Sequence, residues 1–565
     1  MPASLLCNRR VGLTVRVTRL LWAAALALPL SALAQDTALV PALVPTVVQT
    51  IPSFAELEVA GATIGEIRIL NQDIFQTDDP KEDKLLFRWA NALHIQTQVG
   101  VIERALLFRR GEKVSVKLIE ETERVLRSTR YLYDMHIRAI AYRDGVVDIE
   151  VQTRDTWTLD PGFSAGRSGG ANSSGIRLTE YNLLGSGVAL SYGRSKNVDR
   201  SSNEFQFSND RAFGGWTALS YSHATNSDGK RDAATLAHPF YALDTTWAAG
   251  VAGSRDDRIE AIYDGGLIAS QYRHRSRQAE VFGGWSKGRV DGWVWRTSIG
   301  VSRQDDAYAI EPALVAPPQL PLDDKLVVPF VRVEVIEDRF EKVQNRNLIE
   351  RSEFFALGFA STVKLGRATT RFGSSRDTWL YSGSVSRGFE PAPKQTLLAS
   401  AAISGEYAGA GVRHQRFGAQ TQYYLPQSPR WLFYAAASGD VLTKPDPVDA
   451  LLLGGDSGLR GYPLRFQSGT RRALLTIEER AYTDLYFFQL FRVGAAVFFD
   501  TGRAWGGSNS NTANSEWLRN AGLGLRIFST RAAFSNVLHI DIASPIDADS
   551  NVKKVQFLVK TKTSF

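Results

Sequence analysis

The sequence predicts an all-β transmembrane barrel of about 16 antiparallel strands, and up to 20, preceded by one small α/β domain. From Trp157 to Phe565, segments of about ten residues alternate between apolar and polar side chains with period two. Several of these segments begin or end on Trp, Tyr or Phe, as membrane strands do at the two interfaces. Helical spacing of apolar residues is confined to 61–157. No run of about 18 apolar residues follows the N-terminal region, so we expect no transmembrane helix.

Residues 1–34 have the pattern of an export signal peptide. Four arginines precede a short apolar stretch: Arg9, Arg10, Arg16 and Arg19. Leu20 to Leu30 is apolar, and Ala32-Leu33-Ala34 is a small-residue cleavage site. Cys7, the only cysteine, would leave with the signal, which excludes disulfides and cysteine-based metal sites from the mature chain. Its charge would be 62 basic against 59 acidic residues, so nothing indicates a nucleic-acid partner.

Residues 35–60 contain three prolines and are expected to form an extended lead-in. Residues 61–157 are expected to fold as a small domain with one mixed sheet and helices on one face. Its expected elements are a strand at 65–75, helices at 99–108 and 116–126, and strands at 134–142 and 146–153. Asp144-Gly145 is a tight-turn dipeptide that joins the last two strands.

Residues 158–565 are expected to form the barrel. Clear period-two segments occur at 204–208, 216–222, 293–304, 379–387 and 431–442. A soluble propeller or solenoid is the alternative, but the chain shows no fixed repeat period. Short segments at 350–442 raise the count of candidate strands from 16 to about 20.

The last strand, 553–565, is also amphipathic. Val555, Phe557 and Val559 share one face, whereas Gln556 and Lys560 share the other. The chain ends on Phe565. Such an ending resembles the assembly signal of bacterial outer-membrane proteins.

Five motifs follow one another in the order of one known superfamily. They are Asp-Thr-Trp-Thr-Leu at 155–159, Asn-Leu-Leu-Gly-Ser-Gly at 182–187, Leu-Arg-Gly-Tyr-Pro at 459–463, Phe-Phe-Asp-Thr-Gly at 498–502 and His-Ile-Asp-Ile-Ala-Ser-Pro at 539–545. Together they resemble the bacterial surface antigen superfamily, which comprises BamA/TamA-type assembly barrels and two-partner-secretion transporters. The resemblance extends over about 64–565, and the small domain is similar to a single POTRA module.

The resemblance implies that the glycine-rich loop near 454–470 folds into the barrel and that Arg460 contacts Asp500 on the inner wall. A guanidinium offers a planar fork to a carboxylate, so one pair can fix both the position and the orientation of a loop. Glu478 is a weaker candidate for a second wall carboxylate. Gly461 would permit a sharp turn, and Tyr462 would supply a rigid contact surface.

The function implied by the resemblance is insertion of outer-membrane proteins or transfer of polypeptides across the outer membrane of a Gram-negative bacterium. The expected partners are unfolded outer-membrane or secreted polypeptides, the lipid bilayer, and periplasmic chaperones or accessory subunits, without nucleic acid. We expect no catalytic residue, metal or cofactor. A passive pore or structural surface antigen is the alternative function.

An outer-membrane hydrolase is a remote further alternative. Gly-Asp-Ser-Gly at 455–458 matches the nucleophile segment of trypsin-like proteases. That chemistry needs a histidine base and an orienting aspartate, and no histidine here has a matching context. The turns of the Leu-Arg-Gly-Tyr-Pro loop explain the glycines equally well.

Overall fold

The computed structural model describes residues 51–409, 411–507, 516–530, 537–546, 548 and 552–562. The export signal predicted at 1–34, the lead-in up to residue 50 and the terminal Phe565 lie outside the described residues.

The small domain contains one mixed sheet in the order β1-β3-β2. Its elements are α1 (Phe54–Val59), β1 (Thr63–Gln72), α2 (Leu85–Leu93), α3 (Val99–Glu103), α4 (Val116–Arg127), β2 (Leu132–Arg143) and β3 (Val146–Asp155). Strands β1 and β3 are parallel, and β2 and β3 form a hairpin whose turn is Asp144-Gly145. Both turn residues have positive φ, which this type of two-residue turn requires. β2 is therefore an edge strand of the sheet.

Three elements of the small domain differ from expectation, and one of them is helix α2, which was not predicted. The described end of the lead-in is helical rather than extended, because Ser53 and Glu56 form a capping box and Leu57 packs into the core. The helix expected at 99–108 ends at Glu103. The chain then turns to cover the edge of β1, where Gly111 donates to Ile64 and Val114 donates to Ala62. Tertiary pairing thus overrides the helical period here.

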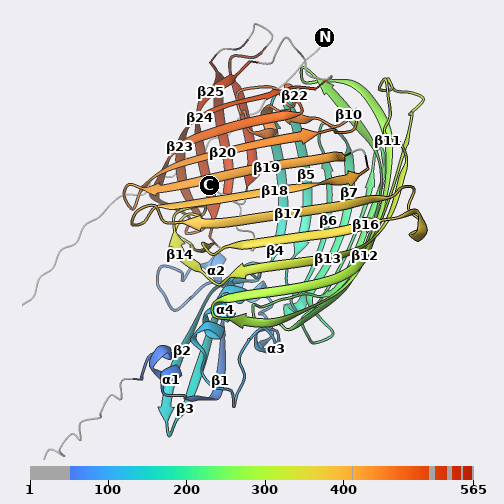
Figure 1. Ribbon diagram of the computed structural model, residues 1–565. Coiled ribbons are helices and arrows are strands. Elements are labelled where there is room, and N and C mark those ends of the chain that lie inside the picture. Colours follow the sequence, from blue (N-terminus) through green and yellow to red (C-terminus); the bar gives the residue numbers. More distant parts are fainter. Residues whose placement is uncertain are drawn as a thin grey trace, which may run out of the picture. The chain divides into compact units, whose positions relative to one another are not determined.

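Strands from Leu159 onward close into an antiparallel barrel (Figure 1), with twenty strands among the described residues. This confirms the predicted fold class. In ring order the strands are β4 (Leu159–Ser168), β5 (Ala171–Glu180), β6 (Val188–Lys196), β7 (Ser201–Ala212), β8 (Thr217–Asn226), β9 (Gly229–His238), β10 (Trp247–Asp264), β11 (Leu267–Val290), β12 (Trp293–Ala309), β13 (Asp324–Glu337), β16 (Ala360–Ala368), β17 (Thr378–Phe389), β18 (Thr396–Ala408), β19 (Gly411–Pro426), β20 (Trp431–Thr443), β23 (Arg471–Phe487), β24 (Phe491–Trp505), β25 (Leu518–Ser529), β26 (Val537–Pro545) and β27 (Gln556–Lys562).

The strand count lies at the upper end of the predicted range rather than at 16. The short segments at 350–442 are the reason, because β16 to β20 all belong to the ring. Five strands, β23 to β27, follow the glycine-rich loop, as the sequence resemblance implies. Between β13 and β16 the chain also forms a hairpin outside the ring, β14 (Phe340–Gln344) and β15 (Ser352–Ala356).

The outer face of the barrel is apolar. Val251, Val281 and Val301 lie opposite one another on β10, β11 and β12, and all three are exposed. Exposed tryptophans begin β10, β12 and β20, which run in the same direction and so place them at one rim: Trp247, Trp293 and Trp431. An apolar belt with an aromatic rim suits a surface that faces lipid. No helix in the described part of the chain is long and apolar enough to span a bilayer.

The ring closes at a weakly paired seam. Within the described residues, β27 and β4 share the single register pair Val559–Arg167. By contrast, β26 pairs with β27 continuously from Val537 to Ala543. Because each register pair contributes backbone hydrogen bonds, the β27–β4 seam is the line along which the barrel separates most easily.

Candidate functional site: the luminal loop and its wall

Two names help to locate the site. The domain mouth is the end of the barrel where β4 begins, and the far mouth is the opposite end. Consecutive strands are antiparallel, so the connections alternate between the two mouths. The connection between β20 and β23 starts at the far mouth and contains β21 (Leu451–Leu453), paired with β22 (Gln467–Gly469), and the single turn η3 (Gly455–Ser457).

Arg460 fixes this loop to the inner wall. Its Nε and Nη2 donate to the two carboxylate oxygens of Asp500 on β24, each at 2.8 Å. Its Nη1 donates to Glu478 Oε1 on β23 at 2.8 Å and lies 3.5 Å from Asp541 on β26. The guanidinium also lies 3.3 Å from the ring centre of Phe498. The structure thus brings Arg460, Asp500 and Glu478 together, and it adds Asp541.

The three carboxylates around Arg460 also bind other side chains of the wall. Asp500 is fully buried and accepts two further hydrogen bonds at 2.9 Å, from Thr476 Oγ1 and Asn520 Nδ2. Arg480 donates to the second oxygen of Glu478 at 2.9 Å. Arg526, which is fully buried, pairs with Asp541. Three arginines therefore meet three carboxylates, so each of these carboxylates faces at least one guanidinium, and Lys560 and Lys562 line the same pocket.

Gly461 and Tyr462 position the loop by close packing. A Cβ on Gly461 would lie 2.6 Å from the Cβ of Asn520, so glycine is needed for the close approach of loop and wall. Gly461 lies in the expected turn, which the hydrogen bond from Tyr462 N–H to the carbonyl of Leu459 closes, and its φ is not positive. Positive φ occurs at three earlier glycines of the loop: Gly454, Gly455 and Gly458. Tyr462 is fully buried and donates through its hydroxyl to the carbonyl of Arg519 at 3.2 Å.

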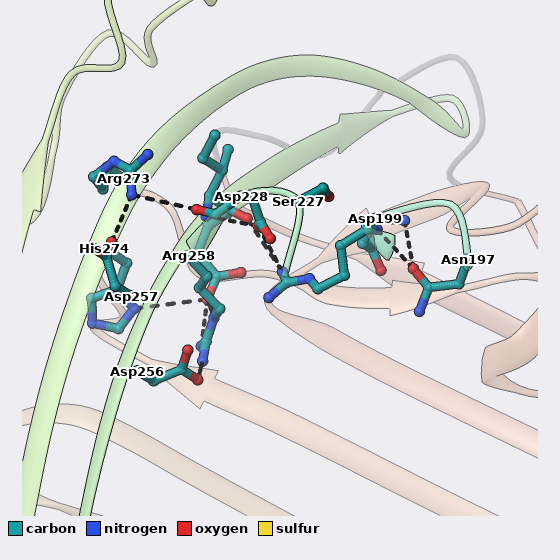
Figure 2. Close-up of polar contacts among 12 residues, drawn as sticks. Asn197, Asp199, Ser227, Asp228, Asp256, Asp257, Arg258, Arg273 and His274 are labelled. Carbon is teal, nitrogen blue, oxygen red and sulfur yellow. Dashed lines mark hydrogen bonds and ion pairs between the residues drawn. The ribbon is translucent and has the colours of Figure 1, made fainter. Parts of the chain in front are cut away.

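A second arginine of the loop reaches another part of the wall. Both Nη groups of Arg465 donate to Asp199, each at 2.7 Å, in the turn between β6 and β7 at the far mouth. Figure 2 shows Asp199 beside Asn197 in this turn. The same view contains Arg258 of β10, which pairs with Asp256, and Arg273 of β11, which pairs with Asp257. Arg460 and Arg465, five residues apart, therefore hold the loop to two different parts of the wall.

A second insertion enters the lumen from the domain mouth. The β14–β15 hairpin and the residues between its strands pack on side chains of the inner wall: Leu348, Ile349, Phe355 and Leu357 pack with Tyr424, Tyr434 and Tyr482. Arg480 Nη1 donates to the carbonyl of Arg346 in this hairpin at 3.0 Å. Since Arg480 also binds Glu478, one wall pair connects the hairpin to the Arg460 loop.

The hairpin also contacts the small domain. Lys342 Nζ lies 3.2 Å from Glu123 on α4, and Arg124 lies 3.6 Å from Asp338. The guanidinium of Arg124 lies 4.5 Å from the ring centre of Phe340. Continuous polar contacts thus connect α4, the hairpin, the wall pair and the far-mouth loop.

Two of the sequence motifs meet where the small domain adjoins the barrel. Asp155 accepts from the backbone of Thr97 at 2.7 Å, and Asn182 donates to the hydroxyl of the same threonine at 2.8 Å. Gly185 and Gly187 have positive φ, and a Cβ on Gly185 would lie 2.3 Å from the carbonyl oxygen of Gln96. The Asn-Leu-Leu-Gly-Ser-Gly turn is therefore a docking element for the small domain.

Sequence reasoning missed Asp541, Asn520, Arg480 and Arg526. The signal for Asp541 was present, because His539 and Asp541 alternate with apolar residues and so share the inner face of β26. Ser457 of the protease-like segment donates to the carbonyl of Gly454 at 2.9 Å and closes a turn. Among the described residues no group of three His, Cys, Asp or Glu side chains could hold a metal ion.

The fold and site define a closed β-barrel whose lumen holds a far-mouth loop fixed by buried ion pairs. No family model matches the sequence, and no curated protein resembles it significantly. Three similar solved structures are BamA from Haemophilus ducreyi lacking POTRA domains 1-3 (13% identity, 88% of this chain and 85% of that one, TM-score 0.39), CdiB from Acinetobacter baumannii (13%, 89% and 73%, 0.40) and CdiB from Escherichia coli (12%, 89% and 76%, 0.44).

Proposed function

We propose that this protein is a barrel of the bacterial surface antigen type that resides in the outer membrane of a Gram-negative bacterium. It inserts outer-membrane proteins or moves unfolded polypeptides across that membrane. The observation that carries the proposal is the combination of a luminal loop tethered by buried ion pairs with a seam held by one register pair. A tethered loop narrows the lumen, whereas a weak seam offers an edge to an incoming strand.

The small domain acts as a POTRA-like docking module on the periplasmic side. Its strand β2 lies at an edge of the sheet, a position that suits addition of an incoming strand by β-augmentation. A cavity of about 710 Å³ lies between the segment 128–131 of this domain and the inner wall of β5 to β8. This cavity provides space for the polypeptide after it has left strand β2. The mechanism needs hydrogen-bond exchange between strands and neither covalent chemistry nor a cofactor. Chaperones or accessory subunits would deliver the polypeptide.

A disulfide across the seam tests this proposal. Paired residues on neighbouring antiparallel strands lie within the Cα distance that a disulfide spans. We expect oxidised Arg167→Cys/Val559→Cys protein, in a Cys7→Ser background, to lose insertion of a small barrel substrate into liposomes and to regain it on reduction. The matched control is Ile540→Cys/Val559→Cys, which joins β26 to β27 away from the seam. Full insertion by the oxidised seam variant would refute lateral opening.

The second candidate is a passive pore, and one observation favours it. Small hydroxyl side chains line a cavity of about 720 Å³ on the inner wall of β16 to β20: Ser382, Ser384, Ser386, Ser400, Ser404 and Ser438. Single-channel conductance of wild type and Arg460→Ala separates the two functions. A static pore should conduct equally in both, whereas a plugged conduit should show larger current fluctuations once its loop is released.

A further inference from the structure

Helix α2 has four large apolar side chains on its exposed face. The exposed fractions are 67% for Leu85, 67% for Leu86, 62% for Trp89 and 75% for Leu93. Positions i, i+1, i+4 and i+8 lie on one side of a helix, so these four residues form a continuous apolar stripe. The opposite face carries Phe87, which is buried. A contiguous exposed apolar stripe of this kind marks a surface that contacts lipid or a partner.

Contacts on the buried face of α2 fix the orientation of the helix. Phe87 stacks on Phe75 with ring centres 4.0 Å apart. The side chain of Asn91 bonds both the backbone N–H and the carbonyl of Phe75, at 3.1 and 2.7 Å. The helix therefore cannot rotate to bury its stripe without losing these contacts.

The stripe is continuous with the lipid-facing surface of the barrel at the domain mouth. The cluster beneath α2 packs against Trp157, which precedes β4, and against Leu490, in the connection between β23 and β24. Phe487 and Phe488, beside Leu490, are 50% and 79% exposed. α2 thus lies next to the apolar belt, close to the first strand of the seam.

We propose that the stripe of α2 lies in the interfacial region of the bilayer leaflet at the domain mouth, with lipid acyl chains as its partner. The proposal rests on the membrane location stated under the proposed function, but it requires no transport activity. Amphipathic helices bind bilayers in this way, with the apolar face below the headgroups. The segment just before the helix carries Lys81 and Lys84 together with four acidic residues (Asp78, Asp79, Glu82 and Asp83), so the apolar stripe and not charge provides the contact. The anchor would hold the small domain beside the seam strand β4.

An environment-sensitive label tests the lipid contact in the full chain. Leu86→Cys in a Cys7→Ser background is labelled with a nitrobenzoxadiazole dye and reconstituted into phosphatidylethanolamine–phosphatidylglycerol liposomes. We expect blue-shifted emission and strong quenching by lipids that carry a nitroxide near the headgroup. The matched control is Val59→Cys on α1, which is 91% exposed and lies outside the stripe. Its label should emit as in water and resist lipid quenching.

Equal, water-like emission from both labels would overturn the proposal and would leave a protein subunit as the occupant of the stripe. Because both sites are exposed, the labels should not prevent folding, and the heat-modifiable gel mobility of the barrel verifies this. A second variant, Leu86→Gln/Trp89→Gln/Leu93→Gln, should reduce quenching of a label at residue 85 by at least half. Unchanged quenching in that variant would also overturn the proposal. If lipid quenches the label at residue 86 but the protein fails in the insertion assay, only the transport function is refuted and the lipid contact stands.

Discussion

Replacing Arg460 with methionine should release the luminal loop while the barrel stays closed. Methionine keeps much of the length of the side chain but removes three hydrogen bonds of 2.8 Å to Asp500 and Glu478. Glu478 keeps Arg480, and Asp541 keeps Arg526. Asp500 is fully buried and keeps only the neutral donors Thr476 and Asn520. Leaving one charge buried without its counterion costs about 3–5 kcal/mol.

Hydrogen exchange of the loop measures this cost directly. The backbone N–H groups of Tyr462 and Leu464 donate to the carbonyls of Leu459 and Gly169, so they exchange only when the loop opens. A loss of about 3–5 kcal/mol should accelerate their exchange by roughly two to nearly four orders of magnitude, because about 1.4 kcal/mol is a factor of ten. Amides of the barrel strands should keep their protection.

Two controls make the reasoning refutable. Arg465→Met removes a partly exposed ion pair from the same loop and should cost about 1 kcal/mol or less. The double variant Arg460→Met/Asp500→Asn should cost less than the sum of the two single variants, since it no longer leaves an unpaired carboxylate. Exchange of Leu464 that accelerates less than threefold in Arg460→Met, or equally in Arg465→Met, would show that the buried ion pairs do not hold the loop.

Three further predictions concern the other anchors. Arg480→Met should destabilise both luminal insertions, so exchange of the β14–β15 hairpin and of the loop should rise together by about tenfold or more; a rise in only one insertion contradicts the coupling. The hydrogen bond from Arg465 lowers the pKa of Asp199, so this anchor is fully formed above the ordinary pKa of 3.8 and is lost as pH falls through the lowered value. The hydrogen-exchange protection of the loop, corrected for the intrinsic exchange rate, should fall at low pH in wild type. In Arg465→Met this protection should depend less on pH. Burial raises the pKa of Glu121 on α4, so its contribution to stability decreases as pH rises. Glu121→Gln should flatten the dependence of thermal stability on pH and add about 1 kcal/mol or less at pH 7.

The sequence by itself determined the class of fold and the central contact of the site. Period-two alternation identifies strands because successive side chains point to opposite faces, and that rule is local. The family resemblance nominated Arg460 and Asp500, with Glu478 as a weaker candidate, and the structure brings these three together. Asp144-Gly145 located a hairpin turn from two residues alone, because few residue pairs adopt positive φ at both positions.

Tertiary structure alone decided the rest. The ring size depends on which strands lie between the two that close the ring, β27 and β4, so the short segments counted as β16 to β20 could be assigned to the barrel only from its pairing. The same applies to helix α3, which ends where the chain covers the edge of β1. The convergence of Asp541, Arg480 and Arg526 on one site could not be read from any local pattern. Each lies on a different strand, and the pairing of the neighbouring strands β23 to β26 places their inner faces around one loop.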